Sequence, residues 1–242
     1  MKALLPFLFF FLTFSSFAQD PATLAQLKKD RQQRKLSAKE NIILLKNGAL
    51  LVRLDQQKRR IDYYAKYNNM KEAEKVKVKM LEENRAIIDA FRTYYKFTPV
   101  YFFALEDSES WLERGTEGLV FYNDNAEADP SIHPSEEVFF VADFSFIEQD
   151  TTSYLSGKTP TPNQENNPEG RAYYGGSKTS KPALVVRDDR LNQLRDPFPF
   201  YRGYSYFGRA KKRYRVPLMR FQEQLEDYYQ KVRASTTTPE TN

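Results

Sequence analysis

Two short apolar runs on either side of a long amphipathic stretch constrain the fold of this chain most. Residues 49–54 (ALLVRL) and 100–105 (VYFFAL) each have the length and composition of a buried strand. Residues 56–95 between them are predominantly helical in pattern. A strand, a helical crossover and a second strand form a βαβ unit, in which the strands pair in parallel with a right-handed connection. The sequence therefore predicts an α/β fold.

The remaining pattern extends this unit to a single domain with a mixed, partly parallel sheet of about five strands. Further strands are predicted at residues 118–122, 137–147 and 182–187, with a short helix at 106–114. An amphipathic C-terminal helix is predicted to begin with Pro217 in its first turn. Its apolar face is predicted to contain Leu218, Phe221, Leu225, Tyr228 and Val232.

The helical crossover has two possible forms. Its second half carries one apolar face, but Asn68 and Asn69 interrupt the pattern, so one long helix and two antiparallel helices are equally compatible with it. The two-helix form is a hairpin inserted after the first strand. The apolar face consists of Ala73, Val76, Met80, Ile87, Phe91 and Tyr94.

Residues 42–54 also allow two interpretations. Ser37 and Glu40 form a capping box ahead of an apolar run, and Gly48 fits the position that closes a helix. The dipeptide Asn47-Gly48 between apolar runs is equally typical of a β-hairpin. The helix is favoured because residues 42–45 do not alternate between apolar and polar.

The first eighteen residues have the layout of a secretory signal peptide. Lys2 precedes an apolar run at residues 3–12, and the small residues Ser16 and Ala18 occupy the positions before a cleavage site at Gln19. We therefore expect a secreted or periplasmic protein. No later segment is long and apolar enough to span a bilayer, so no transmembrane segment is expected after cleavage.

The expected domain layout follows from these boundaries. A signal peptide (1–18) and an N-terminal helical segment (19–47) precede the α/β domain at 48–233. Residues 150–181 are rich in Thr, Ser, Pro, Asn and Gly, which predicts a long flexible loop inside that domain. The Thr-rich tail at 234–242 is predicted to be disordered.

Composition excludes several chemistries. The chain has no cysteine and a single histidine, His133, so disulfides, thiol nucleophiles and zinc sites are not expected. The oxygen-bearing side chains at 123–129 are similar to a calcium loop but lack its turn glycine and closing glutamate. No phosphate loop or dinucleotide-binding fingerprint is present. We therefore expect neither a cofactor nor a bound metal.

Carboxylates provide the candidate catalytic residues. Asp143 lies inside an apolar strand, and Glu106 and Asp107 directly follow the second predicted strand, where sites gather in α/β sheets. A buried carboxylate needs a charged partner or an altered pKa, and both occur at active sites. The alternatives for Asp143 are a solvent-exposed face or a structural arginine partner.

A basic, aromatic segment at 201–215 provides the candidate binding residues. Cations bind anionic groups, and aromatic faces stack on sugars or bases. The expected partner is an anionic envelope polymer, a lipid headgroup or another envelope protein, and no nucleic acid is expected. The alternative is a solvated connection whose aromatic side chains close the core. The candidates are Tyr204, Tyr206, Arg209, Lys211, Lys212, Arg213 and Arg215.

Five segments carry a resemblance, at residues 45–54, 97–103, 148–152, 173–176 and 196–200. Their order resembles that of a family of uncharacterised exported bacterial proteins. The resemblance implies an envelope location but no known activity, and it assigns no catalytic residue. Several members carry a cysteine where this chain has Thr98, which argues against a thiol-based role here.

Together these features predict an exported periplasmic or cell-envelope protein that acts as a non-catalytic binding or scaffolding protein. The alternative is a carboxylate-dependent hydrolase acting on an envelope glycan. A deep pocket at Asp143 or at residues 106–117 would favour the enzyme, whereas a flat surface with carboxylates facing water would favour the scaffold.

Overall fold

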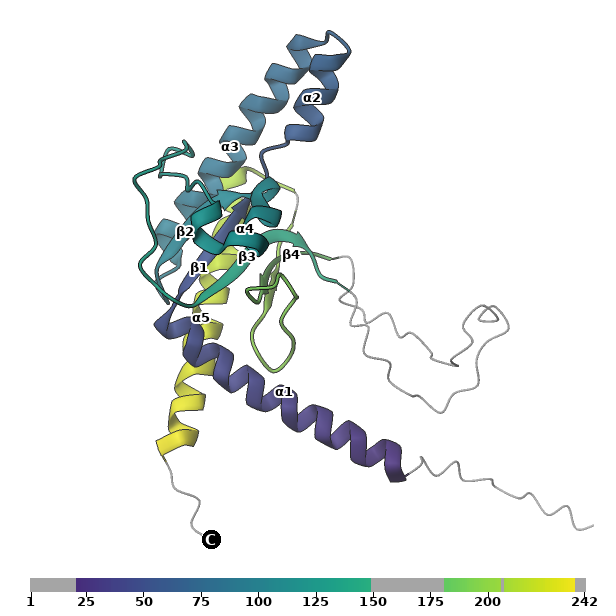
Figure 1. Cartoon of the computed structure of the whole chain (residues 1–242), viewed down its shortest axis with the longest axis vertical. Coiled ribbons are helices and arrows are strands. Elements are labelled where there is room, and N and C mark those ends of the chain that lie inside the picture. Colours follow the sequence, from purple (N-terminus) through teal and green to yellow (C-terminus); the bar gives the residue numbers. More distant parts are fainter. Residues whose placement is uncertain (1–20, 149–180, 206, 238–242) are drawn as a thin grey trace, which may run out of the picture. The chain divides into compact units, whose positions relative to one another are not determined.

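The computed structural model describes residues 21–148, 181–205 and 207–237 (Figure 1). The predicted signal peptide and residues 149–180 of the chain, with nearly all of the predicted loop, lie outside the described residues. The chain divides into two units, and residues 31–150 with 175–242 form the larger one.

Five strands form one sheet in the order β2-β1-β3-β4-β5. The strand β1 pairs in parallel with both β2 and β3, whereas β4 is antiparallel to β3 and to β5. This arrangement confirms the predicted α/β fold with a mixed, partly parallel sheet. The strands are β1 (Ala49–Leu54), β2 (Val100–Ala104), β3 (Phe139–Phe146), β4 (Pro182–Arg187) and β5 (Tyr201–Gly203).

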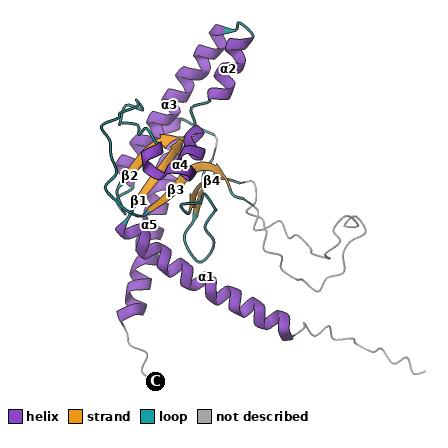
Figure 2. Cartoon of the chain, viewed as in Figure 1, coloured by secondary structure: helices purple, strands orange, loops and turns teal. Residues whose placement is uncertain are grey.

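Helices cover both faces of the sheet (Figure 2). Leu50, Val52 and Leu54 of β1 point into the larger core, which also contains apolar side chains of α1, α3 and α5. Leu51 points the other way and packs with Trp111 of α4. The helices are α1 (Pro21–Asn47), α2 (Lys58–Lys66), α3 (Met70–Tyr94), α4 (Ser108–Arg114) and α5 (Ala210–Thr237), with 3-10 turns at η1 (Leu105–Asp107) and η2 (Gly115–Gly118).

The crossover between β1 and β2 is a helical hairpin rather than one long helix. The two helices meet at residues 67–69, and the side chain of Asn69 accepts a hydrogen bond from the backbone N–H of Glu72 at 3.3 Å, which caps α3. The predicted apolar face is correct, because Ala73, Val76, Met80, Ile87 and Phe91 are all buried. Tyr94, the last residue of that face, is half-buried.

Residues 42–54 form a helix followed by a strand, as favoured from the sequence. The helix α1 runs from Pro21 to Asn47, so Ser37 lies inside it rather than at its start, and the backbone N–H groups around it need no cap. The sequence suggested that Gly48 closes the helix, but the structure shows that a close backbone contact requires a glycine here. A Cβ atom at this position would lie 2.2 Å from the carbonyl oxygen of Val138, so only glycine allows the two backbones to approach.

Two further boundaries differ from the sequence prediction. Residues 118–122 do not form a strand, because η2 occupies the first of them and Phe121 and Tyr122 make only isolated bridges. The helix α5 begins at Ala210, so Pro217 lies inside it rather than in its first turn. Seven residues of α5 precede the proline, and among them Tyr214 is buried and packs against the larger core.

Candidate functional site

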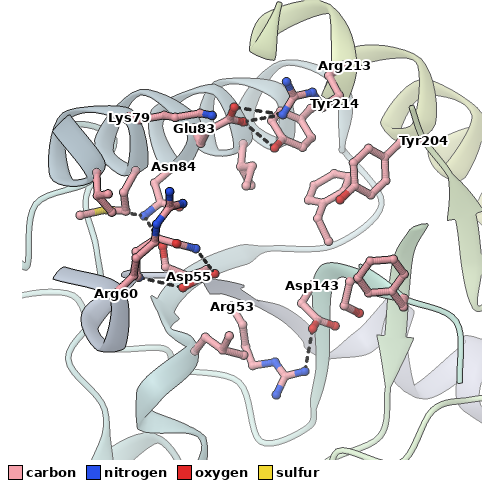
Figure 3. Close-up of a pocket in the computed structure, with 18 of the residues that line it drawn as sticks. Arg53, Asp55, Arg60, Lys79, Glu83, Asn84, Asp143, Tyr204, Arg213 and Tyr214 are labelled. Carbon is pink, nitrogen blue, oxygen red and sulfur yellow. Dashed lines mark hydrogen bonds and ion pairs between the residues drawn. The ribbon is translucent and has the colours of Figure 1, made fainter. Parts of the chain in front are cut away.

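A cavity of about 630 Å³ lies at the carboxyl ends of β1 and β3 (Figure 3). The strand β1 lies between β2 and β3, so the chain leaves β1 for β2 on one side and then passes to β3 on the other side. Such a change of direction is a topological switch point, where ligands bind in open α/β sheets. The cavity walls come from β1, β3, the α2–α3 hairpin and the start of α5.

Asp143 lies at the base of this cavity between two arginines. Its Oδ2 atom accepts a hydrogen bond from Arg53 Nη2 at 2.8 Å, and its Oδ1 atom accepts one from Arg187 Nε at 3.3 Å. All three side chains are at least nine-tenths buried. Burial lowers the pKa of Arg53, and Asp143 partly offsets this effect. Arg187 also donates to Glu148, so the cluster contains two cations and two carboxylates.

A second charged cluster joins the two helices on the opposite wall (Figure 3). Arg213 Nη1 of α5 donates to both carboxylate oxygens of Glu83 on α3, at 3.0 and 3.1 Å. The hydroxyl of Tyr214 donates to the same carboxylate at 2.7 Å. Burial and this hydrogen bond to Glu83 raise the pKa of Tyr214 well above its ordinary value.

Aromatic rings form a third part of the cavity wall. The ring of Phe144 lies 4.5 Å from that of Tyr214 and 5.2 Å from that of Tyr204, measured between ring centres. Tyr214 is buried and the other two are half-buried, so the group presents ring surface to the cavity.

The carboxylates of the cavity have hydrogen-bond or ion-pair partners, whereas some of its cations do not. Its four carboxylates all have partners, because Asp55 accepts from Gln57 and Glu72 binds Lys75 in addition to the two clusters above. Within the described ranges, the side chains of Arg60 and Lys79 form no hydrogen bond or ion pair. Two buried polar atoms of the lining, Arg53 Nε and Ser145 Oγ, also have no partner there.

The three predicted catalytic carboxylates do not come together. Asp143 lines the cavity, but Glu106 is exposed and accepts hydrogen bonds from the backbone of Gln56 and Lys58 at the approach to α2. Asp107 is half-buried in η1 and is not part of the cavity lining. The sequence analysis allowed for one structural arginine beside Asp143, and the structure has two, Arg53 and Arg187.

The basic, aromatic segment divides between the cavity and the surface. Tyr204, Arg213 and Tyr214 line the cavity. Arg209, Lys212 and Arg215 are exposed, and Arg215 lies over the ring of Tyr94 at 5.6 Å. Tyr206 and the side chain of Lys211 lie outside the described residues.

Sequence reasoning missed most of the residues that complete the site. Arg53 and Arg187 carry the same signal as Asp143, a charged residue within an apolar strand, and could have been found by it. No such signal marks Arg60, Lys79 or Glu83, which belong to charged helix surfaces.

Two other cavities carry fewer signs of a site. One of about 700 Å³ lies at the opposite edge of the sheet, around Trp111 and the start of β3. The other contains the exposed His133 with apolar and proline neighbours. In the part of the chain that the structure describes, no three His, Asp or Glu side chains are grouped to hold a metal ion. In the segment that is similar to a calcium loop, Asn123 Oδ1 accepts from two backbone N–H groups and the Asp124 carboxylate accepts from Arg92.

No family model, curated protein or solved structure matches this chain. The resemblance to uncharacterised exported proteins therefore remains a prediction. Thr98 is the position at which this chain differs from the cysteine of several of those proteins. Its side chain is buried and donates a hydrogen bond to the carbonyl oxygen of Gly48. None of the helices within the described ranges combines the length and apolar character that a bilayer-spanning segment requires.

Proposed function

We propose that this chain is an exported, non-catalytic binding protein whose ligand occupies the cavity at the carboxyl ends of β1 and β3. The observation that carries the proposal is a cavity of ligand size at the switch point, about 630 Å³, in which exposed cations lie beside an aromatic wall. Arg60 and Lys79 supply the positive charge, and neither side chain forms a hydrogen bond or ion pair within the described ranges.

The same cavity supports binding more than hydrolysis. A carboxylate-dependent hydrolase needs one carboxyl group that gives up a proton and a second that takes one or attacks the substrate. Both oxygens of Asp143 already accept guanidinium hydrogen bonds, and Glu83 binds Arg213 and Tyr214. Proton transfer by either group would first break an ion pair, whereas binding needs no such change.

The experiment fills the cavity and measures ligand binding. Val76 lines the cavity on α3, and Val78 lies on the exposed side of the same helix. Thermal shift is measured for the parent, Val76→Trp and Val78→Trp against a panel of sugars, sugar acids, sugar phosphates, amino acids and short peptides. We expect at least one compound to stabilise the parent and Val78→Trp but not Val76→Trp.

Circular dichroism of both variants checks that the substitutions leave the fold intact. The proposal fails if no compound stabilises the parent, or if a folded Val76→Trp responds as the parent does. Mass spectrometry of the ligand after long incubation with the parent tests the non-catalytic part. If a cleaved product appears, the protein is not a non-catalytic binder, and the hydrolase alternative is supported instead.

A further inference from the structure

The donors and acceptors of the cavity identify the chemical class of its ligand, an inference that rests on the proposed function. The exposed charged side chains of the lining that lack partners are both donors, because Arg60 and Lys79 cannot accept a hydrogen bond. The carboxylates, which are the strongest acceptors, are already engaged. A complementary ligand therefore presents acceptor oxygens and negative charge.

The aromatic wall adds a second requirement. The rings of Phe144, Tyr204 and Tyr214 contact one another and line the cavity together. A ring surface of this kind packs against the C–H face of a sugar or another flat apolar group, while polar groups fix its orientation. A simple inorganic anion would satisfy the donors but would leave this wall without contacts.

The volume sets the size of the ligand. Small-molecule sites occupy about 300–1,000 Å³, and the cavity of about 630 Å³ lies within that range. We infer that the cavity binds an anionic sugar, a mono- or disaccharide that carries a carboxylate or phosphate group. Its anionic group faces Arg60 and Lys79, and its ring faces the aromatic wall.

The charge contacts determine how binding responds to salt. Arg60 and Lys79 are exposed on the cavity rim, so their attraction to an anion is screened beyond about 8 Å at physiological ionic strength. Affinity for a charged sugar falls as salt is added. Affinity for a neutral sugar, which contacts only the rings and hydroxyl groups, does not.

The test is isothermal titration calorimetry of the full mature chain with four probes: glucuronate, glucose 6-phosphate, glucose and inorganic phosphate. We expect at least one of the two anionic sugars to bind about tenfold or more tightly than glucose and inorganic phosphate. Arg60→Ser and Lys79→Ser each weaken binding of that sugar by about tenfold, the effect of one lost charge-assisted contact.

Neighbouring residues provide matched controls. Arg59 and Lys77 are exposed on the same two helices but do not line the cavity, so Arg59→Ser and Lys77→Ser leave the affinity unchanged. Failure of both anionic sugars to bind, equal binding of glucose, or an equal loss in the control variants overturns the inference. If inorganic phosphate binds as tightly as glucose 6-phosphate, the inference that the ligand contains a sugar is overturned.

The outcomes also separate this inference from the proposed function. If glucose binds the parent and Val76→Trp abolishes that binding, the proposed function stands although this inference fails.

Discussion

Asp143 shows how a buried charge can be stable inside an apolar strand. Removing two guanidinium groups and a carboxylate from water is costly, and only close pairing with good geometry offsets that cost. Arg53, Asp143 and Arg187 lie on neighbouring strands β1, β3 and β4, so the sheet itself holds them at hydrogen-bonding distance. The cluster is therefore built by register rather than by flexible loops.

Replacing Asp143 tests the strength of this cluster. Asp143→Asn leaves two buried arginines without their shared countercharge, and we expect it to lower the free energy of unfolding by about 3 kcal/mol. The exposed pair of Asp124 with Arg92 is a matched control, because its carboxylate is 71% exposed. Asp124→Asn should cost less than about 1 kcal/mol. Urea denaturation measures the free energy of unfolding of both variants. Equal decreases in the two variants would show that the buried cluster is no more important for stability than the exposed pair.

Tyr214 should make stability depend on pH in the alkaline range. Burial and the hydrogen bond to Glu83 raise its pKa in the folded state. Below about pH 10, the tyrosine is protonated in both states and its contribution is complete. Above that pH the unfolded chain loses the proton first, so the free energy of unfolding falls as pH rises towards the folded-state pKa.

Tyr214→Phe removes this effect while keeping the ring. We expect the parent to lose about 1.4 kcal/mol relative to Tyr214→Phe between about pH 8 and pH 11. Tyr95, whose pKa is also raised by burial, is present in both proteins and cancels in the comparison. Urea unfolding at the two pH values gives the difference, and a constant gap between the two proteins would refute it.

At the scale of elements, Gly48 sets how closely α1 and β1 approach the loop before β3. The backbone N–H of Ala49 donates to Val138 O at 2.9 Å, and Gly48 lies against the same carbonyl group. A side chain at position 48 would push these segments apart and break the first pairing contact of β1 with β3.

Gly48→Ala is therefore expected to cost about 2 kcal/mol or more, because the nearest obstacle is backbone rather than a movable side chain. Gly203→Ala is the matched control. Its added Cβ would lie 3.8 Å from the carbonyl oxygen of Pro182, an ordinary contact, and we expect a change within about 1 kcal/mol. Thermal unfolding of the two variants tests this, and similar melting temperatures would show that β1 tolerates displacement.

Elements with strong internal patterns could be predicted from the sequence, and those defined by neighbours could not. The apolar runs of β1, β2 and β4 were located almost to the residue. The strand β5 has only three residues, and its pairing with β4 rather than its own pattern makes it a strand. The part of α5 before Pro217 likewise makes a contact that its own pattern does not reveal, the hydrogen bond from Tyr214 to Glu83 of α3.

At the scale of the whole molecule, the candidate site could be predicted only where one segment carried an unusual residue. Asp143 met that condition, as a carboxylate within an apolar strand. Glu83 and Arg213 are 130 residues apart and look like ordinary charged helix residues until α3 packs on α5. Their role depends on tertiary packing, which single-sequence patterns do not contain.

Export is the remaining prediction at this scale, and it rests on the first eighteen residues. The apolar run at 3–12 must enter a bilayer during export, and Ser16 with Ala18 suits cleavage before Gln19. Mass spectrometry of the protein from the cell envelope is expected to show a mature N-terminus at Gln19.

A charge in the apolar run costs about 2.5–3.5 kcal/mol on insertion, so Phe10→Asp should leave the chain intact in the cytoplasm. Asp20→Asn, beyond the cleavage site, should be exported normally. Intact Met1 in the envelope fraction, or normal export of Phe10→Asp, would contradict the prediction.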